Sequence, residues 1–226
     1  MSACRRSLRP LGTALALGLL GACALPPAAA AATRLPAPVV DAPRAATHGE
    51  QVAVFAGGCF WGVQDVFEHV KGVRRTWAGY SGGSAATAHY DQVSEGDTGH
   101  AESVKVLFDP SEVSYGQLLQ VFFSVAANPT ELDRQGPDSG TQYRSVIFYT
   151  SAEQQRIAAA YLAQLGKARI YASPIVTQLA PLAAFYPAES WHQDYASRHP
   201  DQPYIAIYDA PKVANLRLWF PVLYSR

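Results

Sequence analysis

The chain has 226 residues, enough for one domain or two small ones, and 49% of them are hydrophobic, with 12 Tyr, 9 Phe and 4 Trp. This composition excludes a chain that is disordered throughout, because it supplies enough apolar surface for a core. The 18 basic residues are balanced by 18 acidic ones. That balance argues against a nucleic-acid groove, which requires a dense basic stripe.

The first 22 residues have the pattern of a signal peptide. Arg5, Arg6 and Arg9 precede an apolar run over residues 11–20, which is shorter than the roughly 20 apolar residues of a membrane-spanning helix. We therefore expect an exported protein, located in the periplasm or cell envelope of a bacterium. Cleavage after residue 22 would leave 15 basic residues against 18 acidic ones, so the mature chain would be mildly acidic.

Two kinds of processing fit the end of this leader. Residues 20–23, Leu-Gly-Ala-Cys, resemble a bacterial lipobox, in which Cys23 would carry lipid and tether the protein to a membrane. The small residues around Cys23 fit ordinary signal peptidase cleavage equally well. Residues 23–50 are rich in alanine and proline without an apolar period, and we expect them to form a tether. A single domain over residues 51–226 is expected to follow.

The strands and helices of this domain are predicted from their apolar periods. Strands are expected, in chain order, over residues 52–56, 73–78, 101–108, 143–150, 175–179 and 204–208. Helices are expected over residues 60–70, 114–125, 151–165 and 190–198, and a final helix or wrap over residues 211–219. The strands look half-exposed rather than continuously apolar, which favours a two-layer α+β domain over a parallel sheet covered on both faces.

Cys59 is the only cysteine of the expected domain, since Cys4 lies in the leader and Cys23 lies at its cleavage site. Exported proteins that use cysteine for stability carry it in pairs, so a lone thiol indicates chemistry, with a buried inert cysteine as the alternative. Cys59 follows the strand predicted over residues 52–56 and opens the helix predicted over residues 60–70. Because a helix start favours an anion, we expect its thiolate to form more readily than that of a free cysteine.

Two loops could contribute to a site beside this thiol. Residues 79–84 are glycine-rich, but no Lys-Ser or Lys-Thr pair follows to complete a phosphate loop, so we exclude nucleotide binding. Residues 126–141 form a polar connection of a length at which loops are usually either functional or disordered. We expect this connection to be functional.

Four motifs follow one another along the chain. They are Gly-Gly-Cys-Phe-Trp-Gly at residues 57–62, Gly-Tyr-Ser-Gly-Gly at 79–83, Gly-Asp-Thr-Gly-His-Ala-Glu at 96–102, and the run from Arg134 to Ser145. In this order they resemble the motifs of the peptide methionine sulfoxide reductase A family. Weaker similarity extends from Gln51 to Tyr224. The resemblance implies a two-layer, ferredoxin-like α+β sandwich with extended loops and a C-terminal wrap.

The resemblance also implies a reaction, the repair of oxidised methionine. Methionine S-sulfoxide, protein-bound or free, would be reduced to methionine through attack of Cys59 on sulfur, which leaves a sulfenic acid. Glu102 would supply the proton that the sulfoxide oxygen takes up, and Tyr80 and Tyr143 would hydrogen-bond that oxygen. Sulfoxide oxygen is a strong acceptor and a poor leaving group, so a soft nucleophile, donors and a proton source suit this chemistry.

The remaining implied residues shape the substrate pocket. Phe60 and Trp61 would contact the methyl group of the substrate, and Asp138 would order the polar side of the site. The resemblance implies no bound metal or cofactor. The histidines His100, His192 and His199 have no metal-ligand spacing, and we interpret them as surface or capping residues.

No cysteine after Cys59 could form the disulfide that many members of this family make with the oxidised nucleophile. The sulfenic acid must then be reduced by an external thiol, which could be a thioredoxin-like protein, a glutaredoxin-like protein or a small thiol. The chain is expected to be a monomer that acts on oxidised proteins or free methionine sulfoxide and binds no nucleic acid.

Two other functions remain open at this point. The first is a cysteine hydrolase in which Cys59 pairs with His100 and Asp138 orients the histidine, although no hydrolase signature surrounds His100. The second is a tethered module that holds an oxidised or apolar peptide on Phe60 and Trp61 without turnover.

Overall fold

The computed structural model describes residues 33–225, so the predicted signal peptide and Cys23 lie outside the described residues. The strands are β1 (Gln51–Ala56), β2 (Val73–Ser81), β3 (Ala101–Phe108), β4 (Arg134–Gln135), β5 (Asp138–Ser139), β6 (Val146–Tyr149), β7 (Gln178–Pro181) and β8 (Tyr186–Pro187). The α-helices are α1 (Phe60–Glu68), α2 (Tyr90–Ser94), α3 (Tyr115–Val121), α4 (Ala152–Ala168), α5 (Tyr195–Arg198) and α6 (Ala210–Trp219). Within residues 33–225, no helix is long and apolar enough to cross a membrane.

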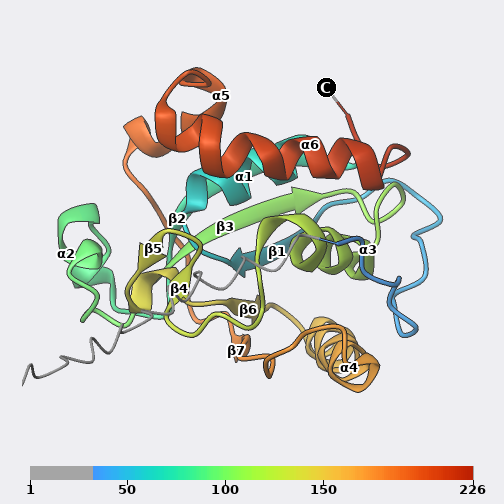
Figure 1. Cartoon of the computed structure of the whole chain (residues 1–226). Helices are drawn as coiled ribbons and strands as arrows, with labels where there is room; N and C mark the ends of the chain where they lie inside the picture. The colour runs from blue at the N-terminus through green and yellow to red at the C-terminus, as the bar shows by residue number, and fades with distance from the viewer. Residues whose placement is uncertain (1–32, 226) are drawn as a thin grey trace, which may run out of the picture. The chain divides into compact units, whose positions relative to one another are not determined.

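The sheet has the strand order β7-β6-β1-β3-β2-β8 (Figure 1). β1 pairs antiparallel with both β3 and β6, and β2 pairs antiparallel with β3. Along the chain, β1, α1, β2, β3, α3 and β6 form a β-α-β-β-α-β unit, with the spatial order β6-β1-β3-β2. The predicted two-layer, ferredoxin-like α+β fold is therefore confirmed, and β7 and β8 extend the sheet at its two edges.

Alternating side chains of β1 separate the two faces of this sheet. Phe55 is fully buried in the larger core, where its ring lies 5.1 Å from the rings of Phe67 on α1 and Phe122 after α3. Val54 and Ala56 point to the other face, where they pack in a smaller cluster that includes Val146 of β6. Because β1 is buried on both faces, the chain that leaves it towards Cys59 starts from a rigid position.

The C-terminal region differs most from the prediction. Residues 204–208 were expected to form a strand, but Ile205–Asp209 is a π-helical segment that continues directly into α6. Ile205 and Asp209 are both buried, whereas Ile207 between them is 61% exposed. This burial pattern is helical, and it shows that packing against α1 overrides the β propensity of the isoleucines.

Three other predicted elements have different bounds in the structure. The strand predicted from Tyr143 begins at Val146, because Thr141–Tyr143 form a 3₁₀ turn. The strand predicted over residues 175–179 lies at Gln178–Pro181. The helix predicted over residues 190–198 is broken by Asp194, whose φ of 53° is left-handed.

Residues 33–45, which we call the strap, pack against the domain although we expected a tether there with little to bury. Leu35 is only 2% exposed, and its backbone is held on both sides. Its N–H donates to Ser124 Oγ at 3.1 Å, and its carbonyl accepts from Gln120 Nε2 at 2.8 Å. The Tyr161 hydroxyl on α4 donates to the Pro36 carbonyl at 2.8 Å. One apolar side chain and a few well-placed partners are therefore enough to fasten a proline-rich segment.

Leu35→Ala is expected to lower the free energy of unfolding by about 2–5 kcal/mol, because it leaves a cavity under the strap. Val39→Ala is the matched control, since Val39 lies on the same strap but is 84% exposed, and it should change stability by less than about 0.5 kcal/mol. Urea denaturation of both variants measures the difference. Equal effects would mean that the strap does not contribute to the fold.

Candidate functional site

Cys59 is placed by a tight turn between β1 and α1. It is the N-cap residue of α1 and is 9% exposed. Gly58 has a φ of 91°, and a Cβ there would lie 2.5 Å from the Cβ of Gln135. Glycine is required at this position both for the turn and for the close approach of the loop that carries β4 and β5. This loop, which was predicted to be functional, therefore lies directly beside the thiol.

Glu102 lies next to the start of α1, although 42 residues separate it from Phe60 in the sequence. Its side chain is 4% exposed, and its Oε2 accepts a hydrogen bond of 3.0 Å from the Phe60 N–H. Burial raises the pKa of Glu102 to about 8. The hydrogen bond from the Phe60 N–H lowers this pKa, and the nearby charge of Asp138 raises it by a smaller amount. At neutral pH this carboxyl is therefore largely protonated and can donate a proton.

The expectation that the Cys59 thiolate forms readily is wrong for the free protein. Burial raises the pKa of Cys59 well above its usual value, and the charges of Glu102 and Asp209 raise it further. The Trp61 N–H at the helix start and the charge of Lys212 act in the opposite direction but do not outweigh burial. The resting form is therefore a thiol, because a helix start offsets only part of the cost of burying an anion.

Phe60 and Trp61 follow Cys59 and form an aromatic surface with Tyr195, His192 and Tyr204, which we call the aromatic wall. Phe60 is 1% exposed, whereas Trp61 is half-buried and stacks on Tyr195 at 3.9 Å between ring centroids. Trp61 Nε1 donates to His192 Nδ1 at 3.0 Å, and the Tyr204 ring meets the Trp61 ring edge-on. The orientation of Trp61 is therefore fixed by three C-terminal residues.

None of these three C-terminal residues was predicted as part of the site. Their signal in the sequence is the density of aromatic side chains over residues 185–208. That density could not be assigned to the site without the fold, because it is also typical of an ordinary core.

The polar side of the site is formed by Tyr143 and Asp138. Burial raises the pKa of Tyr143, and the charges of Glu102, Asp138 and Cys59 add to this effect, so Tyr143 lies among the predicted site residues. Asp138 on β5 accepts a short hydrogen bond from the Tyr204 hydroxyl through its Oδ2. The loop between α3 and β6 thus brings both residues to the thiol.

Tyr80 lies on β2, opposite Glu102 in the register with β3, and its side chain is fully buried. Its hydroxyl donates to Glu189 Oε2 at 2.9 Å. Glu189 was not predicted as a site residue. Its contact with Tyr80 comes from the segment after β8, and no motif in the sequence indicated it.

His100 is held by the glycine-rich loop and does not pair with Cys59. Its Nδ1 accepts from the Gly83 N–H at 3.2 Å, and its Nε2 bonds to the Ser84 carbonyl at 2.9 Å. The cysteine hydrolase alternative is therefore not supported, because both ring nitrogens of His100 bond to this loop. His100 caps this loop, as expected of a capping residue, but His100 and His192 are 1% and 0% exposed, so neither lies on the surface.

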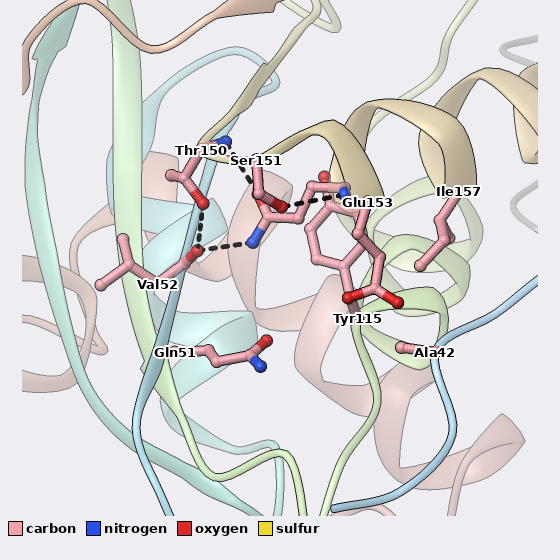
Figure 2. A pocket seen from close by; sticks show the side chains of 9 residues that line it. Ala42, Gln51, Val52, Tyr115, Thr150, Ser151, Glu153 and Ile157 are labelled. Atoms are coloured by element: carbon pink, nitrogen blue, oxygen red, sulfur yellow. Dashed lines mark hydrogen bonds between the residues drawn. The ribbon is translucent and has the colours of Figure 1, made fainter.

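A pocket of about 300 Å³ lies at the opposite end of β1 from Cys59. It is lined by residues of β1, α3 and α4, and none of the predicted site residues is among them. Figure 2 shows this pocket, with Val52 of β1 on one side and Glu153 and Ile157 of α4 on the other. The Gln154 amide of α4 donates to the Val52 carbonyl at 2.8 Å. The residues around Cys59 are therefore the candidate active site.

Several known proteins have sequences similar to this chain. A family model described as peptide methionine sulfoxide reductase matches residues 51–220. The chain is 58% identical over 180 residues to the peptide methionine sulfoxide reductase MsrA 2 of Mesorhizobium japonicum. The aligned stretch covers 80% of this chain and 92% of that protein. It is 46% identical over 174 residues to the peptide methionine sulfoxide reductase MsrA of Thermus thermophilus, covering 77% of this chain and 97% of that protein.

Two solved structures are similar to the fold. Methionine sulfoxide reductase A of Corynebacterium diphtheriae has a TM-score of 0.58 at 33% identity, and covers 69% of this chain and 77% of that chain. Mxr1 of Saccharomyces cerevisiae in its reduced form has a TM-score of 0.59 at 28% identity, and covers 70% of this chain and 92% of that chain.

Proposed function

The chain belongs to the peptide methionine sulfoxide reductase family, and we propose that Cys59 and Glu102 carry out its reaction together. The proposal rests on one observation about Glu102. Its carboxyl has a pKa of about 8 and accepts a hydrogen bond from the N–H of Phe60, the residue next to Cys59. The Cys59 sulfur attacks the sulfur of methionine sulfoxide and gives it two electrons. The oxygen leaves the substrate and ends on Cys59 as a sulfenic acid, while methionine is released.

The protons of this step balance without any outside acid or base. Cys59 begins as a thiol, and the sulfenic acid that it becomes also carries one proton, on oxygen. Glu102 gives its proton to the sulfoxide oxygen as the sulfur–oxygen bond breaks. It then regains a proton, which is the one that the Cys59 thiol loses. A carboxyl with a pKa near the operating pH is suited to both transfers.

The aromatic wall provides the apolar part of the substrate pocket. Phe60 and Trp61 contact the methyl group of methionine sulfoxide, and the stacking of Trp61 on Tyr195 holds this surface in place. Tyr143 lies on the polar side, where its hydroxyl can reach the sulfoxide oxygen, and Asp138 helps to order this side through its hydrogen bond from Tyr204. A pocket with one apolar and one polar side can distinguish the two sulfoxide epimers, and we propose the S epimer as substrate.

The proposed function is tested by incubating the protein with the separate S and R epimers of a methionine sulfoxide peptide and dithiothreitol. Chromatography should show methionine from the S epimer only. Reduction of the R epimer alone would contradict the assignment of the site.

We propose that an external thiol reduces the sulfenic acid, because Cys59 is the only cysteine among residues 33–225. The reductant is a thioredoxin-like protein, a glutaredoxin-like protein or a small thiol. Without a reductant, the protein is expected to form at most one equivalent of methionine per chain. Quantifying methionine with and without dithiothreitol measures this limit, and several equivalents without dithiothreitol would contradict it.

We also propose that the protein is exported and acts in the bacterial cell envelope. The support is the leader sequence, with three arginines followed by an apolar run, and the Leu-Gly-Ala-Cys pattern that ends at Cys23. Cys23 is either the acylated N-terminus or is removed with the leader. Mass spectrometry of the mature N-terminus distinguishes these outcomes, and an intact leader on protein from the native host would contradict export.

A further inference from the structure

Glu189 joins three segments of the site through its two carboxylate oxygens. Oε2 accepts from the Tyr80 hydroxyl on β2, and Oε1 accepts from the Tyr90 N–H at the start of α2, each at 2.9 Å. Burial favours the neutral acid, but the hydrogen bonds from the Tyr90 amide, its own amide and Tyr80 outweigh it and lower the pKa of Glu189. Glu189 is therefore a carboxylate at neutral pH, and both of its oxygens act as acceptors.

The bond to Glu189 determines what Tyr80 can do in the reaction. A phenol has one proton, so a Tyr80 hydroxyl that donates to Glu189 cannot donate to the sulfoxide oxygen at the same time. Burial, the bond to Glu189 and the Glu189 charge raise the pKa of Tyr80, so the phenol keeps its proton. The lone pairs on the Tyr80 oxygen remain, and they can accept a hydrogen bond.

Tyr143 is not restricted in this way. None of the hydrogen bonds among residues 33–225 involves its hydroxyl, and its pKa is raised by burial and nearby negative charge without any hydrogen bond. Its proton is therefore available to the substrate. The two tyrosines of the site, to which the family resemblance gives the same role, are thus in different hydrogen-bonding states.

We propose that Glu189 is a positioning residue that accepts the hydrogen bond of the Tyr80 hydroxyl, so that Tyr143 alone donates to the sulfoxide oxygen and Tyr80 acts as an acceptor. The inference rests on the proposed function of the site. After Glu102 has protonated the oxygen, the new O–H needs an acceptor, and the Tyr80 oxygen provides one. No proton leaves Tyr80 at any step, and the sulfenic acid of Cys59 can keep the same hydrogen bond.

Glu189→Gln reverses the hydrogen-bond direction at Tyr80. The single carbonyl oxygen of the glutamine is needed by the Tyr90 N–H, so the amide NH₂ faces Tyr80 and donates to its oxygen. The Tyr80 proton is then free to point into the site. In this variant Tyr80 becomes a second donor, and the reaction should depend less on Tyr143.

A double-mutant cycle tests the inference through kcat/KM for an S-sulfoxide peptide with dithiothreitol. In the otherwise unchanged protein, Tyr143→Phe should lower kcat/KM by about 10- to 100-fold, because a hydrogen bond to an oxygen that develops charge is lost. In Glu189→Gln, the same change should lower it by less than about 3-fold. An equal loss in both backgrounds would overturn the inference, because a merely structural role of Glu189 does not alter the dependence on Tyr143.

Glu153→Gln is the matched control, since Glu153 is an exposed carboxylate on α4 beside the remote pocket (Figure 2). It should leave the Tyr143→Phe effect unchanged. If Glu189→Gln does not fold, the comparison of Tyr143→Phe with Tyr80→Phe decides, because the donor Tyr143 should matter several-fold more. A greater or equal loss of kcat/KM in Tyr80→Phe would overturn the inference. Failure of the proposed function is a separate result, since the protein without substitutions would then not reduce the S-sulfoxide peptide at all.

Discussion

Cys59→Ser is expected to lower kcat/KM for methionine sulfoxide reduction by at least about 10³-fold, because it removes the nucleophile. A serine hydroxyl is harder and far less acidic than a thiol, and it cannot accept the sulfoxide oxygen. The fold should persist, because serine is a favoured N-cap residue and Cys59 is the N-cap of α1. Chromatographic measurement of methionine from an S-sulfoxide peptide checks the result.

Thermal unfolding provides the control for Cys59→Ser, since an unchanged melting temperature shows that the loss is chemical. The same variant separates an enzyme from a module that only holds oxidised peptides. Retention of more than a tenth of the activity would contradict the assignment of Cys59 as the nucleophile.

Glu102→Gln is expected to lower kcat/KM by about 10²- to 10⁴-fold, the usual contribution of a general acid. Glutamine has the same size and its oxygen can still accept from the Phe60 N–H, but it has no carboxyl proton to give. In the unchanged protein, kcat/KM should fall as pH rises through about 8, because Glu102 then loses its proton. A pH–rate profile of the variant should lack this descending limb, and its persistence would assign the limb to another group.

The same pKa predicts how stability depends on pH. The pKa of Glu102 is raised from its ordinary value of 4.5 to about 8, so the folded state holds this proton more tightly than the unfolded state. The resulting stabilisation is complete below pH 4.5 and is lost as pH rises to about 8. Urea denaturation at several pH values should show a smaller loss in Glu102→Gln, and identical profiles would contradict the raised pKa.

Local patterns predicted the elements whose determinants are close in sequence. The Ser-x-x-Gln pattern of Ser114 and Gln117 is typical of a capping box at a helix start, and both of its hydrogen bonds are present at the start of α3. The helical period of Phe60, Val63 and Phe67 likewise corresponds to the buried face of α1. The residues that follow Tyr204 have a β-rich pattern, but they pack against α1 as a helix, which no local rule could indicate.

The site was predictable only as far as its residues lie in local motifs. Cys59, Glu102 and Tyr143 are brought together as expected, whereas Glu189 and His192 reach the site from the segment after β8. The state of the thiol could not be predicted either. A helix start is visible in the sequence, but the burial that raises the pKa of Cys59 depends on the whole fold.

If Cys23 carries lipid, the strap limits how far the domain can move from that lipid. A free tether over residues 23–50 could span about 90 Å when fully extended. Because Leu35 is fastened to α3 and the residues that follow it, only the chain between Cys23 and Leu35 could act as a leash, with a reach of about 40 Å. If Cys23 carries lipid, the strap therefore confines repair to oxidised proteins that come close to the surface of the bilayer.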